Sequence, residues 1–306
     1  MKAKLMERVS AALLMPRLED ESVDVPALRA LVTFLMEKGV LSYAVNGATG
    51  EFCLTTPEQL ALVLETVAEV SGGAAQVVCG VGAGGIGGTL KMVRVAEKAN
   101  VAGILLPMPY FFPYEQGDLE AFCRGVAVRT SLPILLYNLP QFTSGLESET
   151  VRRLIGEVPN IVGIKDSSGS LEILRDLRRY GVEATGIVGN DSVFAEGLKE
   201  GVCDGVISGV ACVLPEILLG LYRLRRDPNG AEFARTAGLL DEVIAELNRF
   251  PTPWGLKWMA EARGILNARF ALPVSSERAE SAVRMKEWAS SWLPEALKAL
   301  GFGHMD

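Results

Sequence analysis

The chain has 306 residues, of which 49% are hydrophobic and 22% are charged, and its formal net charge at pH 7 is −7. So large an apolar fraction excludes a disordered chain, and the length provides a core for one large domain or two small ones. The acidic balance, without any block of basic residues, argues against nucleic acid or an anionic membrane surface as a partner.

Features of secreted and membrane proteins are missing from the sequence. There is no uncharged apolar run of about 18 residues, so we expect no transmembrane helix. Glu7 and Arg8 interrupt any apolar segment near the N-terminus, so we expect no signal peptide. The five cysteines include no CxxC pair, which predicts reduced core cysteines instead of disulfides or a metal centre. Together these features predict a cytoplasmic protein.

Short apolar runs alternate with longer amphipathic segments up to about residue 225. We predict a strand from each short run, because these runs are almost continuously apolar, as parallel strands buried on both faces are. The predicted strands are residues 9–14, 42–46, 75–79, 102–106, 133–137, 161–164, 185–188 and 205–208. The predicted helices between them are residues 25–38, 57–71, 86–99, 116–130, 147–155, 170–180, 192–200 and 214–225.

The even spacing of these units favours one fold. A strand and a helix recur about every 25–30 residues, which is typical of a TIM (β/α)8 barrel of about 250 residues. A doubly wound sheet is the alternative, but it requires a change in strand order that a sequence does not reveal. We therefore predict a barrel over residues 1–225 that carries the catalytic site.

The strand pattern ends beyond residue 225. Residues 231–249, 254–268 and 276–300 predict helices that are separated by prolines. We predict that residues 226–306 form a three-helix extension of the barrel and not an independent domain.

The acid–base chemistry available to the chain is limited by its single histidine, His304, which lies close to the C-terminus. We expect this residue in a frayed tail. That position argues against Ser-His-Asp or Cys-His hydrolysis and against a catalytic zinc site built on histidines. Proton transfer in an enzyme of this sequence then falls to Lys, Tyr, Asp, Glu or water.

Lys165 is the residue that most strongly suggests chemistry. It follows the predicted buried strand at 161–164, whereas the other nine lysines lie near the N-terminus or on helix-type segments with charged neighbours. Desolvation at such a place favours the neutral amine, which is the nucleophile that forms a Schiff base with a carbonyl. The spacing alone equally allows a surface ion pair between Lys165 and Asp166.

Tyr137 ends the preceding predicted strand, so its side chain and that of Lys165 can point into one barrel mouth. A phenol at that position can move protons in a site without histidine. Taken alone, Tyr137 is better explained as an aromatic residue of the barrel lid.

Two glycine-rich turns suggest binding sites of different kinds. Residues 47–51 combine close backbone N–H groups with the Thr49 hydroxyl, which suits a carboxylate, and we expect Glu51 to hold this turn. An ordinary βα turn explains the same residues. Residues 80–85 match GxGxxG, but they follow the third predicted strand, and the next strand lacks the acidic residue that a dinucleotide site requires.

Several motifs occur in order at the mouth of the predicted barrel. They are Gly47-Ala48-Thr49-Gly50-Glu51, Tyr137-Asn138-Leu139-Pro140, Gly163-Ile164-Lys165-Asp166, Gly189-Asn190-Asp191 and Asp204-Gly205-Val206-Ile207-Ser208. In their order and spacing they resemble the dihydrodipicolinate synthase / N-acetylneuraminate lyase family of pyruvate-type class I aldolases, over about residues 5–300.

The resemblance implies a TIM barrel with a three-helix extension that assembles as a homotetramer. It implies Lys165 as the Schiff-base lysine, Tyr137 as the proton shuttle, and Thr49 with nearby backbone as the site of the pyruvate carboxylate. The remaining candidate substrate-binding residues are Ala48, Gly50, Tyr110, Phe142, Ser167, Gly189, Asn190, Asp191, Ile207 and Ser208.

Three residues depart from the pattern of the dihydrodipicolinate synthases. Phe142 stands where those enzymes have an arginine that grips the carboxylate of the second substrate. Ala48 replaces the threonine of a Tyr–Thr–Tyr proton relay, and Phe111 falls where a neighbouring subunit lends the second tyrosine. We therefore expect condensation of pyruvate with aspartate semialdehyde to be lost.

These residues together predict a Schiff-base class I aldolase or lyase that acts on pyruvate or a 2-keto-3-deoxy sugar acid without a metal or organic cofactor. Its partners are a small keto acid and an aldehyde, whose tail is polyhydroxylated or, because of Phe142, less polar. The alternatives are the lysine-pathway synthase, a dehydratase that uses the same iminium, a non-catalytic keto-acid-binding protein, and a nicotinamide dehydrogenase built on residues 80–85.

Overall fold

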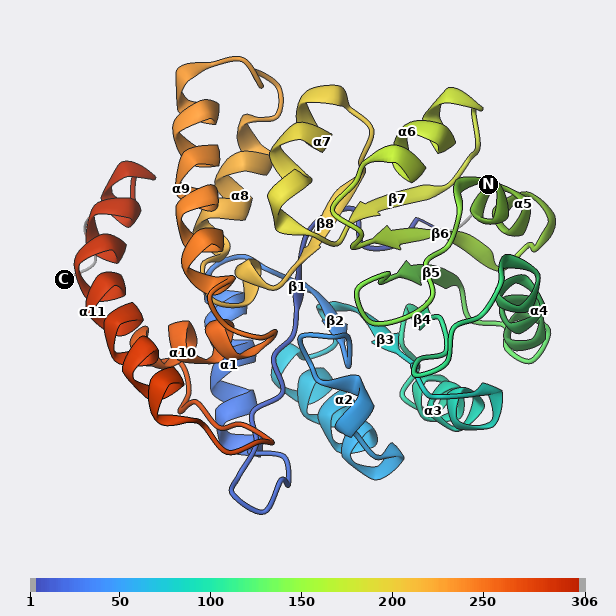
Figure 1. Ribbon diagram of the computed structural model, residues 1–306, viewed down its shortest axis with the longest axis horizontal. Helices are drawn as coiled ribbons and strands as arrows, with labels where there is room; N and C mark the ends of the chain where they lie inside the picture. The colour runs from blue at the N-terminus through green and yellow to red at the C-terminus, as the bar shows by residue number, and fades with distance from the viewer. Residues whose placement is uncertain (1–3, 303–306) are drawn as a thin grey trace.

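The computed structural model describes residues 4–302 and contains a closed barrel of eight parallel strands. Each strand pairs with the next along the chain, and β8 pairs with β1 to close the barrel. Figure 1 looks into the barrel, around which the helices are arranged. The predicted TIM barrel is therefore confirmed. The strands are β1 Arg8–Ala12, β2 Ser42–Val45, β3 Gln76–Gly80, β4 Gly103–Pro107, β5 Ile134–Asn138, β6 Ile161–Asp166, β7 Thr185–Val188 and β8 Gly205–Ser208.

A helix follows each strand of the barrel. These helices are α1 Val25–Glu37, α2 Pro57–Ser71, α3 Ile86–Lys98, α4 Gln116–Ala127, α5 Ser148–Glu157, α6 Glu172–Arg179, α7 Phe194–Glu200 and α8 Pro215–Leu224. Short 3-10 turns precede three of them, namely η1 Phe52–Leu54 before α2, η2 Asp191–Val193 before α7 and η3 Val210–Cys212 before α8.

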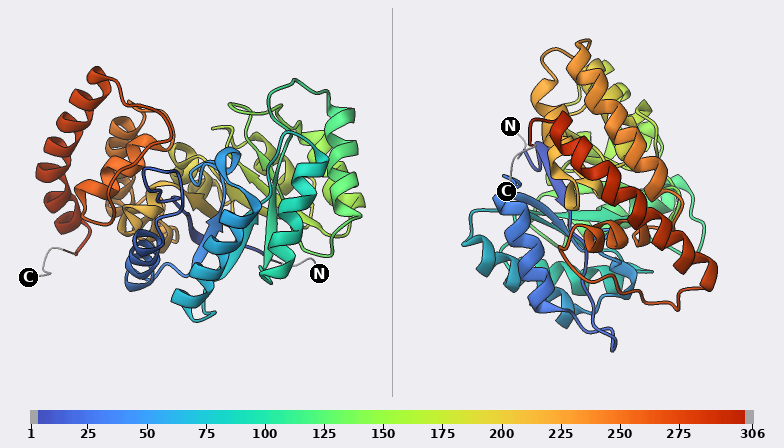
Figure 2. Two further views of the ribbon diagram at one scale, coloured as in Figure 1. Left: turned by 90° about the horizontal axis from the view of Figure 1, so that it is seen from below. Right: turned by 90° about the vertical axis from the view of Figure 1, so that its left-hand side faces the viewer.

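A C-terminal helical extension follows α8, as predicted. It consists of α9 Ala231–Leu247, α10 Trp254–Ala262 and α11 Ser276–Ala299. The helix expected over 254–268 is shorter than predicted, because Gly264 adopts the left-handed conformation at φ 68° and ends α10. Figure 2 shows the extension gathered on one side of the barrel.

A buried ion pair docks the extension onto the barrel. The Arg263 guanidinium at the end of α10 donates to both carboxylate oxygens of Glu216 in α8, over 3.0 and 3.1 Å. The Lys38 Nζ lies 3.2 Å from the same carboxylate. Burial alone would raise the pKa of Glu216, but the hydrogen bonds and charge of Arg263 outweigh it and hold this pKa below its usual value.

The two faces of the strands form two hydrophobic layers. Alternate side chains of a strand point to opposite faces, so one set fills the barrel and the other packs against the helices. The inner set, with Tyr137, includes Ala12, Ala44, Val78, Leu105, Leu135, Ile187 and Ile207. The outer set includes Ile104 and Leu136, which join the larger core beneath the helices. Tyr137 therefore belongs to the interior of the barrel.

All five cysteines are free. Cys79, Cys123 and Cys212 are buried, and Cys203 is half-buried. The prediction of a core residue is wrong for Cys53, which is exposed because it lies in the η1 turn at the rim of the barrel.

Two further observations concern residues 4–302. Within this range no helix is both long and apolar enough to cross a bilayer. No group of three or more His, Cys, Asp or Glu side chains in this range is placed to hold a metal ion. His304 lies outside the described residues.

Candidate active site

Lys165 and Tyr137 meet inside the mouth of the barrel. Tyr137 in β5 is paired with Lys165 in β6 in the register of the two parallel strands. The Lys165 Nζ donates a hydrogen bond to the Tyr137 Oη over 3.1 Å and lies 4.2 Å from the centre of its ring. The two residues are only 3% and 2% exposed. A surface ion pair between Lys165 and Asp166 is excluded, because adjacent residues of a strand project to opposite faces.

The next residues of the two strands brace this pair from the outer face. The Asn138 Nδ2 donates to the Asp166 Oδ1 over 2.9 Å, which joins the ends of β5 and β6. Burial raises the pKa of Asp166, whereas hydrogen bonds from Ser168 and Asn138 act in the opposite direction. Because the bridge is buried, it fixes the strand ends on which Tyr137 and Lys165 stand.

Gly189 follows β7 and leaves space for the lysine. A Cβ atom at this position would lie 2.1 Å from the Ser167 Oγ and 2.7 Å from the Lys165 Cε. The serine hydroxyl and the lysine side chain therefore approach the same point. The Ser167 Oγ is buried and has no hydrogen-bond partner among the described residues, so a bound substrate can supply one.

The turn at residues 47–51 is held by a buried ion pair with the extension. The Lys257 Nζ in α10 lies 2.6 Å from the Glu51 Oε2 and also donates to the Arg269 carbonyl oxygen over 2.9 Å. Lys257 is 2% exposed and Glu51 8%. Burial lowers the pKa of Lys257, and the charge of Glu51 opposes that shift. Glu51 thus holds the turn that carries Thr49.

Lys257 is the second buried lysine of the site region, and sequence reasoning missed it. The expectation that the nine other lysines lie near the N-terminus or on charged helical surfaces is wrong at this position. The neighbours of Lys257 in α10 are mostly apolar, and Gly255, Leu256, Trp258, Met259 and Ala260 are all buried. A lysine within so apolar a helical stretch was the feature of the sequence that could have predicted its burial.

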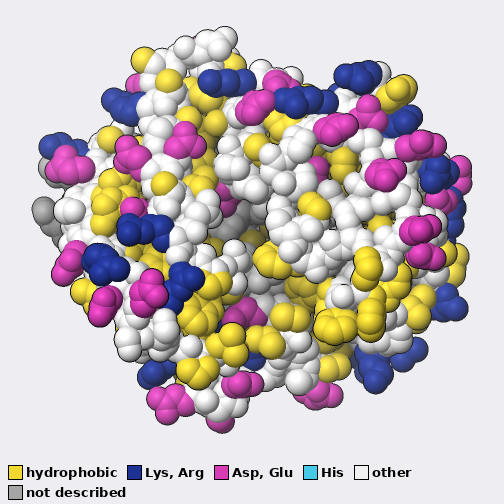
Figure 3. Space-filling model, viewed as in Figure 1, with side chains coloured by type: hydrophobic (Ala, Val, Ile, Leu, Met, Phe, Trp, Pro, Cys, Tyr) yellow, Lys and Arg dark blue, Asp and Glu magenta, His cyan; other side chains and the backbone are white. Residues whose placement is uncertain are grey.

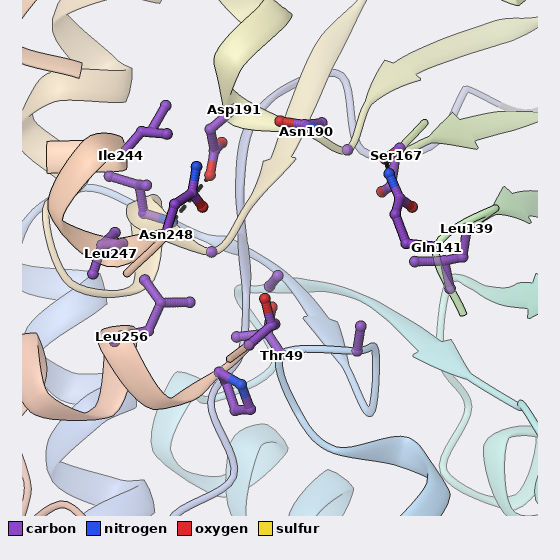
Figure 4. Close-up of a pocket in the computed structure, with 18 of the residues that line it drawn as sticks. Thr49, Leu139, Gln141, Ser167, Asn190, Asp191, Ile244, Leu247, Asn248 and Leu256 are labelled. Atoms are coloured by element: carbon purple, nitrogen blue, oxygen red, sulfur yellow. Dashed lines mark hydrogen bonds between the residues drawn. The ribbon is translucent and has the colours of Figure 1, made fainter. Parts of the chain in front are cut away.

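A cavity of about 360 Å³ opens above Lys165 and Tyr137 at this end of the barrel. The face drawn in Figure 3 is hollowed at the barrel mouth, and Figure 4 shows residues that line the cavity. The predicted substrate-binding residues that line it are Ala48, Thr49, Phe142, Ser167, Gly189, Asn190, Asp191 and Ile207. They come from the ends of five different strands, which is the arrangement expected of a barrel enzyme.

Three other predicted substrate-binding residues do not line this cavity. Gly50 is buried within its own turn. Ser208 is fully buried, and its Oγ accepts a hydrogen bond from the Ala211 backbone N–H over 2.9 Å. Tyr110 packs edge-on against Phe52, with ring centres 5.8 Å apart. The structure therefore places these three residues in the packing around the cavity.

One wall of the cavity comes from the C-terminal extension. Its residues are Ile244, Leu247, Asn248, Phe250, Pro251, Thr252, Pro253, Gly255 and Leu256. Leu256 lies close to Thr49, because a Cβ atom at Gly209 would be 2.7 Å from the Leu256 Cδ1 and 3.5 Å from the Thr49 Oγ1. Strand ends in the sequence do not indicate this wall. They also did not indicate Ala12, Gln141, Ser192 and Val210.

Asp191 gives the cavity its negative charge. Its Oδ2 accepts a hydrogen bond from the Val210 N–H over 3.3 Å, whereas its Oδ1 is buried without a partner among the described residues. Burial raises the pKa of Asp191, and the hydrogen bonds of Ser208 and Val210 and the charge of Lys165 act against this rise. The carboxylate therefore has one oxygen available to a ligand.

The glycines at residues 80–85 are explained by packing. A Cβ atom at Gly80 would lie 1.9 Å from the Asn46 carbonyl oxygen, and one at Gly82 would lie 2.5 Å from the Phe52 ring. These two glycines let β3 and its turn pack against the end of β2 and against η1. The motif is therefore accounted for without a nucleotide.

Comparison with known proteins places the chain in a family. It matches the dihydrodipicolinate synthetase family over residues 5–290. It is 34% identical over 260 residues to the 4-hydroxy-tetrahydrodipicolinate synthase of Sorangium cellulosum (strain So ce56). This alignment covers 84% of this chain and 85% of the relative. It is 30% identical over 268 residues to the enzyme of that name from Bacillus subtilis (strain 168), covering 87% and 92% of the two chains.

A solved structure agrees with these relatives. A crystal structure of a dihydrodipicolinate synthase superposes with a TM-score of 0.85 at 26% identity, over 97% of this chain and 100% of the other. The fold and the buried lysine define a barrel enzyme of the lyase class. The chain belongs to the dihydrodipicolinate synthetase family, a family of Schiff-base class I aldolases.

Proposed function

We propose that the protein is a class I aldolase that makes or breaks a C–C bond of pyruvate or a 2-keto-3-deoxy acid. Lys165 attacks the C2 carbonyl, and loss of water gives an iminium that accepts the electron pair when the C3–C4 bond breaks. Tyr137 moves the proton to and from the C4 hydroxyl. The amine itself supplies the electron sink, so the proposal requires no metal and no organic cofactor.

The observation that carries this proposal is the contact between Lys165 and Tyr137. An amine and a phenol 3.1 Å apart, both buried at the bottom of an open cavity, are suited to form an iminium and to transfer its protons. The turn at 47–51 lies on the same cavity, where Thr49 and nearby backbone N–H groups suit the carboxylate of the keto acid. A keto-acid-binding protein without turnover needs no phenol at that distance.

Lysine-pathway synthase activity is the second candidate, because the matched relatives carry the name 4-hydroxy-tetrahydrodipicolinate synthase. The lining residues argue against it. Phe142 offers no charge at the rim of the cavity, and Ala48 offers no hydroxyl. Incubation with pyruvate and aspartate semialdehyde tests this candidate directly, and we expect product formation at no more than the rate without enzyme.

Borohydride trapping with pyruvate tests the proposed chemistry. Wild type should gain the mass of one reduced pyruvate adduct, and peptide mapping should place it on Lys165. The Lys165→Ala variant should gain none. Lys257, the other buried lysine, is the internal control, because its ion pair with Glu51 keeps it out of the reaction. An adduct on Lys257, or no adduct in wild type, would refute the mechanism.

We further propose a cytoplasmic homotetramer. The free cysteines favour a reducing compartment. Phe111 and Phe112, which are 87% and 61% exposed and stack edge to face, form an apolar surface of the kind that subunits bury. Sedimentation analysis tests the assembly, and a monomer at micromolar concentration would contradict it.

A further inference from the structure

The cavity has two opposite sides, one formed by the barrel and the other by the extension. In Figure 4, Leu139 and Gln141 lie on one side, and Ile244, Leu247 and Leu256 lie on the other. The second group belongs to α9 and α10, so the extension provides an apolar wall at the far end of the cavity. Whatever reacts with the keto acid on Lys165 must extend into this space.

The charges that line the cavity are few. Among residues 4–302, the charged side chains on its wall are Lys165 and Asp191. The amine of Lys165 is consumed when the Schiff base forms, and the turn that carries Thr49 is taken by the carboxylate of the keto acid. A second carboxylate or a phosphate on the aldehyde would thus find no cation, and it would meet the Asp191 carboxylate in a poorly solvated place.

Two polar side chains stand at the boundary between the reaction centre and the apolar wall. Figure 4 shows Asp191 and Asn248 directed toward one another, Asp191 from the start of η2 and Asn248 from the end of α9. The Asp191 Oδ1 is buried and has no partner among the described residues. An open acceptor of this kind is satisfied by a hydroxyl donor, and an amide beside it can bind the oxygen of the same hydroxyl.

We propose that the second substrate is an uncharged aldehyde with a hydroxyl group next to its carbonyl and an apolar far end, and that Asn248 of the extension is a specificity-determining residue. The inference rests on the proposed function. In the reaction, C3 of pyruvate loses a proton and bonds to the aldehyde carbon, and the carbonyl oxygen gains a proton to become the C4 hydroxyl. The second hydroxyl then lies between Asp191 and Asn248, and the alkyl end contacts Ile244 and Leu256.

Four aldehydes of equal carbon number test this substrate class. 2-Hydroxybutanal has the proposed pattern, butanal lacks the hydroxyl, erythrose has a polar far end, and succinic semialdehyde has a charged one. At saturating pyruvate, wild type should use 2-hydroxybutanal with a kcat/KM at least about tenfold above that of each of the others, because an unpaired polar group in the site penalises a mismatched substrate. A preference for erythrose or for succinic semialdehyde would overturn the inference.

Substitutions at Asn248 separate specificity from folding. Asn248→Ala should lower kcat/KM for 2-hydroxybutanal by about tenfold and leave that for butanal within about twofold, because only the hydroxylated substrate loses a hydrogen bond. Asn248→Arg should instead raise the rate with succinic semialdehyde, since it adds the missing cation. Asn229→Ala, on the same extension but away from the cavity wall, is the matched control and should change neither rate.

Borohydride trapping of pyruvate on the same variants distinguishes a failure of the proposed Schiff-base chemistry from a failure of the proposed role of Asn248. Trapping at the wild-type rate in Asn248→Ala, with a selective loss of 2-hydroxybutanal turnover, supports the inference. Normal trapping together with equal losses for butanal and 2-hydroxybutanal overturns it and leaves the proposed function intact. Absence of trapping in wild type overturns the proposed function and this inference with it.

Discussion

Replacement of Lys257 by methionine removes one half of the buried ion pair that holds the turn at 47–51. The Nζ of Lys257 lies 2.6 Å from the Glu51 Oε2, and the nearest other cation, Arg17, has its Nε 3.9 Å from the same oxygen. Methionine preserves most of the volume of the lysine side chain in α10. The variant therefore leaves a buried carboxylate with one distant partner.

The cost follows from the burial of both residues. Loss of one partner from a buried ion pair destabilises a protein by about 3–5 kcal/mol, because the remaining charge is uncompensated. An unfolding entropy of about 2.1 cal/mol/K per residue corresponds to roughly 0.64 kcal/mol/K for a chain of 306 residues. Tm should therefore fall by roughly 5–8 °C.

The same substitution should weaken the binding of the keto acid. Thr49 lies on the turn that Glu51 anchors, and a charge-assisted hydrogen bond that is lost when the turn shifts is worth about 1.5 kcal/mol, or about tenfold in KM for pyruvate. Borohydride trapping rates measured against pyruvate concentration give this KM. The rate at saturation should change less, because Lys165 and Tyr137 stand on β6 and β5.

Two control variants test whether the ion pair between Lys257 and Glu51 causes the loss of stability. Lys91→Met replaces an exposed lysine of α3 and should leave Tm within about 1 °C of wild type. The double variant Glu51→Gln/Lys257→Met removes both members of the 2.6 Å pair and should regain at least half of the lost Tm, since the buried carboxylate is gone and Arg17 keeps its hydrogen bonds to the Glu21 carbonyl oxygen and the Thr55 hydroxyl. A single variant as stable as wild type, or a double variant no better than the single one, would show that the pair does not hold the turn.

Three further predictions follow from the geometry. Gly189→Ala should slow borohydride trapping by at least about tenfold, because its Cβ would displace the Lys165 side chain. Gly238→Ala in α9, with open space around it, is the control, and equal trapping rates in the two variants would contradict this geometry. The pKa of Glu216 is lowered in the folded protein, so its stabilising effect is present above its unfolded pKa of about 4.3 and is lost as the pH falls through the lower folded value. Tm should thus fall more steeply below about pH 4.5 in wild type than in Glu216→Gln, and parallel curves would refute this. A thiol reagent should label Cys53 first, because the residue is exposed, but slowly below about pH 8, because partial desolvation of its sulfur raises the pKa of the thiol; mass spectrometry that finds another cysteine labelled first would contradict the packing.

The contact between Lys165 and Tyr137 could be predicted from the sequence because its geometry is local to two neighbouring strands. The alternation of apolar runs with amphipathic segments predicted β5 and β6 as neighbours in a parallel barrel. In such a barrel, inward-facing residues at the C-terminal ends of neighbouring strands meet at the mouth. Tyr137 and Lys165 occupy such positions on β5 and β6, so they lie side by side. The same reasoning predicted the position of Thr49 and of Asp191 on the cavity wall.

The sequence did not indicate which residues close that cavity. Lys257 contacts Glu51 across 206 positions of the chain, and Asn248 faces Asp191 from a helix that the sequence shows only as amphipathic. Helical periodicity tells which face of α9 and α10 is apolar, but not which part of the barrel that face covers. The docking of the extension, through contacts such as the one between Arg263 and Glu216, decides this. The sequence was therefore sufficient to predict the barrel and the place of Lys165 in it, because both follow from local patterns, whereas the cavity wall from α9 and α10 depends on how these helices dock.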